Sequence, residues 1–264
     1  WLVLTQRNTP ANTSVRFAHS NYKTFYVPES LFRYQPKKMP FAAARYNQCS
    51  IVGNSGILVN SGCGHRINQA DFVIRFNFPP VLTRFMKDSG IRTHLFTCNA
   101  GIIDTNMSRS QNDQPMEKLR LEENSPPVRP PLSRACTRLV SRLVRHVLHD
   151  SRYQHDSVRG VFLNHPEHRR KTTEFWARKG LVERSLSSGF YVISAALSFC
   201  DRVRVFGFWP FERDRRGRAL RYHYGVRPRD QGPDNPWHRM DREFYKLVQL
   251  YAKGIIELVT KPCS

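Results

Sequence analysis

Two histidines in the C-terminal third of the chain are of a type and setting that could move a proton. His223 lies within Tyr222-His223-Tyr224, in a polar, arginine-rich segment where apolar packing does not explain it. His238 precedes a predicted helix, and Glu243 follows it in that helix. Histidine titrates near neutral pH, and a general base contributes about 10²–10⁴-fold in rate. A lone loop histidine is more often a plain surface residue, so the two gain meaning only beside a binding site.

Asparagines stand at the ends of three predicted strands, at about residues 49–52, 72–77 and 93–99. They are Asn54, Asn77 and Asn99. In an open α/β sheet, ligands bind at the carboxyl ends of the strands, where loop amides and helix starts meet. Gly53 and Gly56 would let the backbone come close to a ligand, and the asparagine amides offer donors and acceptors. The segment is neither a Walker A loop nor a dinucleotide-binding turn, because the required lysine and glycine spacings are missing.

A helix start with two hydroxyls is a further polar feature. Ser187-Ser188-Gly189 begins a predicted helix that runs to Cys200, with Ser187 or Ser188 as its N-cap. Free N–H groups at such a start suit a carboxylate or a phosphate, and simple capping explains this segment alone equally well. After the next predicted strand, Trp209 lies in an aromatic cluster at 207–211 that could wall a base or a sugar, or fill the core.

The elements that would position these residues alternate along the chain. Further strands are predicted at 158–163, 203–207 and 255–259, and helices at 132–149, 169–179, 187–200 and 240–253. Such alternation is typical of a mainly parallel sheet covered on both faces. Residues 1–45 are predicted to form a stem or wrapping arm, 46–264 the folded domain, and the polar segment 104–131 a surface insertion.

The chain is strongly basic. Its 264 residues include 42 Lys and Arg against 21 Asp and Glu, a formal net charge of +21. This balance favours a polyanionic partner, namely nucleic acid, an anionic membrane surface, or an acidic glycan or nucleotide, and a solvated basic surface is the plainer alternative. No nucleic-acid motif is recognisable, and the basic residues are scattered over presumed helix backs, so we expect no nucleic-acid partner.

Cysteines and glycosylation sequons favour the secretory pathway. The six cysteines fit no zinc spacing, and sequons begin at Asn12 and Asn106. No apolar run approaches the roughly 18 residues that span a bilayer. The chain does not begin with Met, so we expect any signal or membrane anchor to lie upstream of Trp1.

Three blocks of the sequence resemble motifs of one enzyme family. Residues 49–77 resemble the large motif of animal sialyltransferases, 186–211 their small motif, and His238-x-x-x-x-Glu243 their very small motif. The segment Asn60-Ser61-Gly62-Cys63-Gly64 looks most like the alpha-2,8 branch. The blocks follow the family order over about residues 46–264, and the match is poor at 104–157.

The resemblance implies an α/β fold, a single Rossmann-like (GT-A-like variant) domain with a mainly parallel sheet flanked by helices. It implies inverting transfer of sialic acid from CMP-sialic acid to a sialylated glycoprotein or glycolipid in alpha-2,8 linkage, with His238 as catalytic base. His223 would stabilise the departing phosphate. The residues implied to bind the donor are Asn54, Asn77, Ser187, Ser188, Gly189, Trp209, Tyr222 and His223, and more loosely Asn99, because Ala100-Gly101 replaces the usual Pro-Ser. No metal or other cofactor is expected, and the chain has no Asp-x-Asp pair.

The resemblance also implies covalent links and a compartment. It pairs Cys49 with Cys200 and Cys63 with Cys263, and it assigns no partner to Cys98 or Cys136. It implies the luminal part of a Golgi type II membrane protein, anchored only through a segment outside this chain.

Two departures from the family pattern keep an alternative open. The third motif continues as Gly225-Val226 where Tyr-Asp is usual, and Phe76 replaces a residue that is commonly Cys. The alternative is a catalytically weak relative that acts as a sialoglycan-binding module. For an enzyme, we expect the basic helices between Leu132 and Arg184 to guide an anionic acceptor, with salt weakening transfer more than donor binding.

Overall fold

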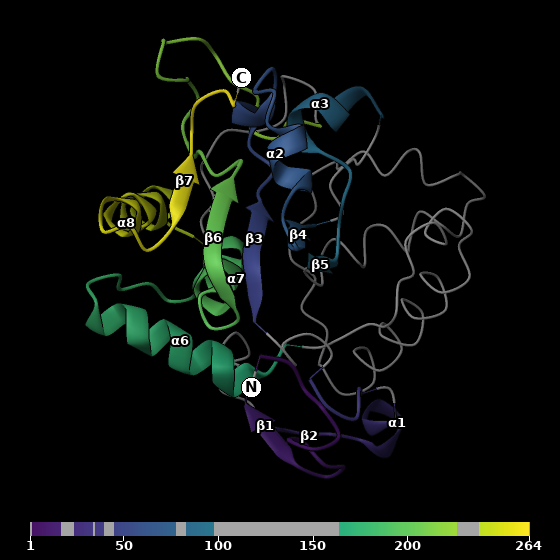
Figure 1. The fold of residues 1–264 in the computed structure, drawn as a ribbon. Coiled ribbons are helices and arrows are strands. Elements are labelled where there is room, and N and C mark those ends of the chain that lie inside the picture. The colour runs from purple at the N-terminus through teal and green to yellow at the C-terminus, as the bar shows by residue number, and fades with distance from the viewer. Residues whose placement is uncertain are drawn as a thin grey trace, which may run out of the picture.

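A five-stranded parallel sheet forms the centre of the fold. The computed structural model describes residues 2–16, 24–33, 35–39, 45–77, 83–97, 164–225 and 238–263. The strands are β3 (Tyr46–Val52), β4 (Phe72–Phe76), β5 (Leu95–Thr97), β6 (Cys200–Phe206) and β7 (Glu257–Val259). They lie in the order β5-β4-β3-β6-β7, and every neighbouring pair is parallel (Figure 1). The expected α/β fold with a mainly parallel sheet is confirmed.

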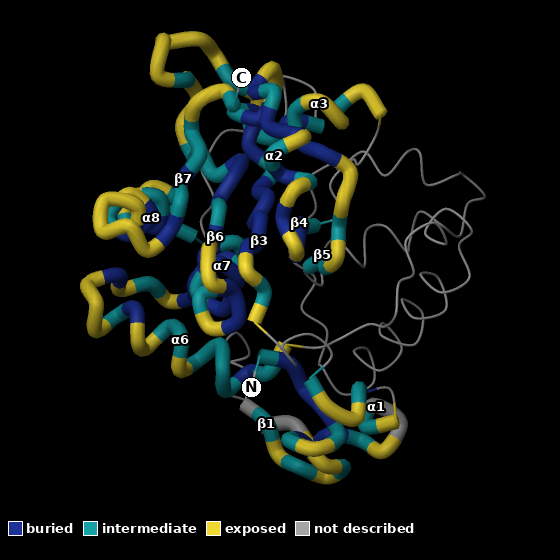
Figure 2. Tube along the Cα trace, viewed as in Figure 1, coloured by how far each residue is buried: buried dark blue, intermediate teal, exposed yellow. Residues whose placement is uncertain are grey.

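The inner strands are buried on both faces, as strands covered on both sides must be. Ile51 of β3 lies opposite Ile74 of β4, and both are fully buried. Ile51 and the next residue, Val52, point to opposite faces and belong to two separate core clusters. The sheet therefore has a core on each face, and its inner strands are largely dark blue in Figure 2.

Three longer helices accompany the sheet: α6 (Pro166–Arg178), α7 (Ser188–Ala196) and α8 (Met240–Ala252). Shorter ones are α1 (Glu29–Phe32), α2 (Gly64–Asn68), α3 (Met86–Ser89) and the 3₁₀ turns η2 (Gly56–Leu58) and η3 (Thr83–Phe85). α7 is apolar almost all round because it packs between the sheet and α6. Phe190 of α7, 1% exposed, meets the ring of Trp176 from α6 edge-on at 5.1 Å between centroids.

The N-terminal residues form a separate two-stranded antiparallel sheet of β1 (Ser14–Arg16) and β2 (Thr24–Tyr26). Before it, Val3 is buried in the larger core and pairs with Asn164. The His165 amide donates to the Leu2 carbonyl at 2.9 Å. These contacts hold the first residues against the start of α6, and the division into 1–45 and 46–264 stays a prediction.

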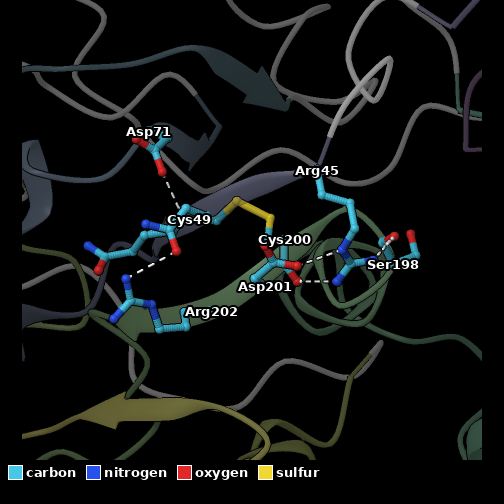
Figure 3. Close-up of polar contacts among 9 residues, drawn as sticks. Arg45, Cys49, Asp71, Ser198, Cys200, Asp201 and Arg202 are labelled. Carbon is cyan, nitrogen blue, oxygen red and sulfur yellow. Dashed lines mark hydrogen bonds and ion pairs between the residues drawn. A yellow bond between two sulfur atoms is a disulfide. The ribbon is translucent and has the colours of Figure 1, made fainter.

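Both implied disulfides are present, Cys49–Cys200 and Cys63–Cys263. The prediction that the helix from Ser187 runs to Cys200 is wrong, because α7 ends at Ala196 and Cys200 begins β6. Long-range bonds override the local apolar pattern there. Arg45 donates to the Asp201 carboxylate at 2.6 Å and to the Cys200 carbonyl at 2.9 Å, and the disulfide joins the same strand to β3 (Figure 3).

Several predictions concern residues that the structure does not describe. They are the helix at 132–149, the strand at 158–163, the insertion at 104–131, the sequon at Asn106, and the residues Cys98, Asn99 and Cys136. Within the described ranges, no helix has the length and apolar character needed to cross a membrane.

Candidate active site

The loop after β3 meets the loop after β6 at the carboxyl edge of the sheet. This is the switch point, because β4 and β5 continue from β3 to one side and β6 and β7 lie on the other. The Ser55 amide donates to the Gly207 carbonyl at 3.1 Å. A Cβ atom on Gly53 would lie 2.5 Å from the same carbonyl oxygen and 2.9 Å from the Phe208 ring. Only glycine fits at position 53, and this close approach brings Asn54 to the switch point.

The segment with the first histidine pairs with this loop. The Tyr224 amide donates to the Asn54 carbonyl at 2.8 Å, and Ser55 and His223 form an antiparallel bridge. The His223 and Tyr222 rings lie 4.4 Å apart between centroids. The structure therefore brings Asn54, Tyr222 and His223 together from opposite ends of the sequence.

The two described strand-end asparagines share an unusual feature. Asn54 donates from Nδ2 to the Phe76 carbonyl at 3.0 Å, which ties the β3 loop to the end of β4. Asn77 follows Phe76 and has φ 58°, a left-handed conformation that asparagine tolerates better than most residues. The Oδ1 atoms of both asparagines are buried and accept no hydrogen bond from any described residue. A buried acceptor without a donor is costly, so both amides are suited to accept from a ligand O–H or N–H.

The start of α7 is held by a buried carboxylate. Ser187 is the N-cap, and its Oγ accepts from the Phe190 amide at 3.1 Å. The same hydroxyl donates to Glu243 Oε2 at 2.5 Å, and the Ser187 amide donates to Glu243 Oε1 at 2.6 Å. Ser187 therefore has its polar groups engaged within the protein, whereas Ser188 begins the helix and is half-buried. The capping interpretation of this turn is confirmed for Ser187.

Phe208 connects the helix start with the β3 loop. A Cβ atom on Gly189 would lie 2.5 Å from the Phe208 ring, and one on Gly53 would meet the other side of the ring at 2.9 Å. Both glycines are thus required for the same aromatic contact. The α7 start, with Ser188 and Gly189, therefore lies at the same edge of the sheet as Asn54.

His238 lies beside the same turn. Its Nδ1 is 3.2 Å from the Ser185 carbonyl oxygen. A carbonyl can only accept, so Nδ1 carries the proton of the neutral ring and Nε2 keeps its lone pair. Burial lowers the pKa of His238, and the nearby Arg169 lowers it further, against a raising effect of the Ser185 bond. The ring is therefore neutral near pH 7, the form that a general base needs.

Trp209 joins the β3 loop to α8. Its carbonyl accepts from Ser55 Oγ at 2.9 Å, and its ring lies 5.3 Å from Phe244 and 5.0 Å from Phe211. The indole Nε1 donates to the Arg213 carbonyl at 2.8 Å. The ring is half-buried, so it lines the edge of the site while packing on α8.

Comparison with known protein families identifies the family of this chain. Residues 2–255 match the family described as glycosyltransferase family 29 (sialyltransferase). The chain belongs to that family. It is therefore a glycosyltransferase, and the family expected from the three motif blocks is confirmed.

Individual sialyltransferases are similar over the whole chain. Alpha-2,8-sialyltransferase 8E of Homo sapiens is 32% identical over 268 residues, which cover 100% of this chain and 69% of the relative. Alpha-N-acetylneuraminide alpha-2,8-sialyltransferase of Xenopus tropicalis is 34% identical over 266 residues, covering 99% of this chain and 74% of the relative. Both carry the name of the branch that the segment at 60–64 predicted.

Solved structures support the fold. A crystal structure of a mammalian sialyltransferase superposes with a TM-score of 0.58 at 18% identity, covering 98% of this chain and 90% of that chain. Another, in complex with Gal-beta-1-3GalNAc-ortho-nitrophenol, gives 0.53 at 19% identity, with 97% and 82% covered. At this identity the likeness concerns the fold alone.

Two residues that build the candidate site, Phe208 and Arg169, could not be identified from the sequence alone. In the sequence, Phe208 is only one member of the aromatic cluster at 207–211, whereas in the structure its ring packs between Gly53 and Gly189. Arg169, whose guanidinium donates to the Leu186 carbonyl at 2.5 Å and lies over the Tyr191 ring at 5.0 Å, had no local signal.

Within the described ranges, no three His, Cys, Asp or Glu side chains group as metal ligands. The expectation of no metal stays a prediction.

Proposed function

We propose that this sialyltransferase transfers sialic acid from CMP-sialic acid to a sialylated glycan in alpha-2,8 linkage, by inverting displacement with His238 as general base. The linkage is supported by the names of relatives that match the entire chain. One observation supports a donor site at the carboxyl edge of the sheet. The Oδ1 atoms of Asn54 and Asn77 are buried there without a hydrogen-bond donor, and His223 pairs with Ser55, the residue after Asn54. The hydroxyls and amine of a cytidine nucleotide are donors of this kind.

The bonds change as follows. A hydroxyl oxygen of the acceptor attacks the anomeric carbon of the donor sugar as the bond from that carbon to the phosphate oxygen breaks. Nε2 of His238 takes the hydroxyl proton, and CMP departs with the bonding electron pair. His223 and the first-turn amides of Ser188 and Gly189 stabilise the growing phosphate charge, as preorganised donors do in low-dielectric sites.

His238 is suited to this step by its setting. The Ser185 carbonyl fixes the tautomer, and burial keeps the ring neutral. The acceptor side is a sialylated glycoprotein or glycolipid, and the site works in the Golgi lumen as part of a type II membrane protein. No metal takes part in the proposed transfer.

The function is tested by product mass spectrometry. The protein is incubated with CMP-sialic acid and a panel of alpha-2,3- and alpha-2,6-sialylated acceptors, with unsialylated galactosides as the matched control. We expect one or more sialic acids added to the sialylated acceptors, with linkage-specific sialidase digestion identifying alpha-2,8 bonds. Transfer to the galactosides alone would contradict the acceptor, and glycan binding without any transfer would identify a binding module instead.

A further inference from the structure

An arginine-rich hairpin leaves the candidate site between Trp209 and Tyr222. This hairpin, residues 212–221, carries five arginines against one Glu and one Asp. It projects past the carboxyl end of β6 as the lime-green loop at the top of Figure 1. The hairpin therefore has a net charge of +3 over ten residues. Membership of the family does not by itself explain this charge.

The hairpin is ordered by its own bonds. Arg213 pairs with Ala219 across it, and the Leu220 amide donates to the Glu212 carbonyl at 2.7 Å. At its tip, Asp214 accepts from the amides of Arg216 and Arg218 at 2.9 Å each. The hairpin therefore presents its side chains from a fixed frame, which reduces the entropy lost on binding.

Both ends of the hairpin are attached to the proposed donor loop. Ser55 Oγ donates to the carbonyl of Trp209 just before it, and the Gly56 amide donates to the carbonyl of Arg221 at 3.1 Å. A molecule bound on the hairpin therefore lies next to the site.

Two of the arginines are available to a partner. Arg218 is paired with Asp214, and Arg213 donates to the Gly217 carbonyl at 2.7 Å. Arg215 and Arg216 are exposed, and neither forms an ion pair with a carboxylate of the described residues. The Arg215 guanidinium lies 5.9 Å over the Trp209 ring, which points it along the rim of the site.

We propose that the hairpin binds acceptors carrying more than one sialic acid, with Arg215 and Arg216 contacting the carboxylate of a sialic acid beyond the one that is extended. The proposal rests on the proposed function and adds the charge class of the acceptor. Guanidinium groups match carboxylates with paired hydrogen bonds. A membrane surface is the poorer partner, because the hairpin residues 212–221 expose no large apolar side chain for insertion.

Direct binding tests the proposal without turnover. Alpha-2,8-linked trisialic acid is titrated into the wild type and into the double variant Arg215→Ala/Arg216→Ala, with CMP titrated in parallel. The matched control is Arg178→Ala/Lys179→Ala, which removes the same charge from an exposed region at the end of α6. We expect the hairpin variant to bind trisialic acid about tenfold more weakly, with CMP affinity unchanged and the control like the wild type.

Other results would overturn the proposal. Equal losses in the hairpin and control variants would indicate net charge alone, and a parallel loss of CMP affinity would make the hairpin part of the donor site. Unchanged trisialic acid binding, with phosphatidylserine vesicles losing affinity instead, would identify a membrane surface. Binding of trisialic acid does not require transfer. If the protein transfers to no sialylated acceptor, the proposed function fails, but the binding test of the hairpin can still be carried out.

Discussion

Glu243 accepts two hydrogen bonds from Ser187, one from its amide at 2.6 Å and one from its hydroxyl at 2.5 Å. The very small motif is thereby bonded to the small motif, and the first turn of α8 fixes the start of α7. His238, at the other end of the same motif, holds the Ser185 carbonyl. The two ends of His238-x-x-x-x-Glu243 therefore both act on residues 185–187.

Replacing Glu243 with Gln should change the pH dependence of stability. Burial raises the pKa of Glu243 to about 7, against hydrogen bonds from Ser187 that lower it. Between pH 4.5 and 7 the folded protein keeps a proton that the unfolded chain has released, so stability falls as pH rises. Glutamine does not titrate, so the free energy of unfolding of the variant should lack this fall. Between pH 4.5 and 7 the difference in unfolding free energy should therefore shift by about 3 kcal/mol in favour of the variant, measured by guanidinium unfolding.

Glutamine can still accept from the Ser187 amide and donate to its hydroxyl, so the cap should persist and CMP binding should change little. Glu243→Ala is the comparison, since it leaves both Ser187 donors without a partner and should weaken CMP binding. If the difference in unfolding free energy between wild type and the Gln variant does not change with pH, burial does not raise the pKa of Glu243 as described.

Replacing His238 with Ala should lower the transfer rate by about 10²–10⁴-fold while CMP affinity stays within about twofold. In the wild type, the acidic limb of kcat/KM should have its midpoint below 6.5, because burial lowers the pKa of His238. The rate should rise with pH through that midpoint and level off above it, since only the neutral ring accepts a proton. Exposed His65 on α2 gives the control, His65→Ala. An acidic midpoint above 6.5, or full activity in His238→Ala, would exclude it as the base.

Gly56→Ala should damage the site through the backbone. A Cβ atom there would lie 2.1 Å from the Arg221 carbonyl oxygen, so the segment leading to Tyr222 and His223 must move. We expect a loss of about 1–3 kcal/mol in stability and at least about tenfold in CMP affinity. Gly180→Ala, where nothing lies within 4 Å but φ is +85°, should cost stability only. Equal CMP affinity in both variants would argue against a donor site at this loop.

Removing the Cys49–Cys200 disulfide by Cys49→Ala/Cys200→Ala should destabilise the fold strongly. The bond closes a loop with a sequence separation of 151, for which chain-entropy reasoning gives about 5 kcal/mol. That is comparable to the whole stability of many domains, so we expect a large drop in the guanidinium midpoint. A shift worth less than about 1 kcal/mol would show that the Arg45–Asp201 ion pair and the Arg45 hydrogen bonds hold the strands without the disulfide.

Transfer should not need a divalent metal. The proposed charge stabilisation comes from His223 and the α7 amides, so EDTA is expected to leave the rate unchanged. The expectation would be contradicted if EDTA abolishes transfer and if adding back Mn²⁺ or, in a parallel sample, Mg²⁺ restores it.

Much of the site could be predicted where the signal is local. Asn54 and Asn77 follow apolar runs, and a Ser-Ser-Gly turn before an apolar helix predicts an N-cap. The boundary at Cys200 could not be predicted, because the apolar run of α7 continues toward it and only pairing with β3 makes it a strand. The contributions of Phe208 and Arg169 likewise depend on partners far along the chain.

The sequence by itself determined the five strands of the parallel sheet, the helix start at Ser187 and the family motifs, because these depend on residues a few positions apart. Only the tertiary structure decided that Glu243 engages Ser187, that the Phe208 ring packs against two glycine turns, and that both ends of the arginine hairpin are bonded to the loop after β3. These contacts join residues from 19 positions apart (Gly189 and Phe208) to 165 positions apart (Gly56 and Arg221), and packing of the whole core selects them. No local pattern encodes that selection.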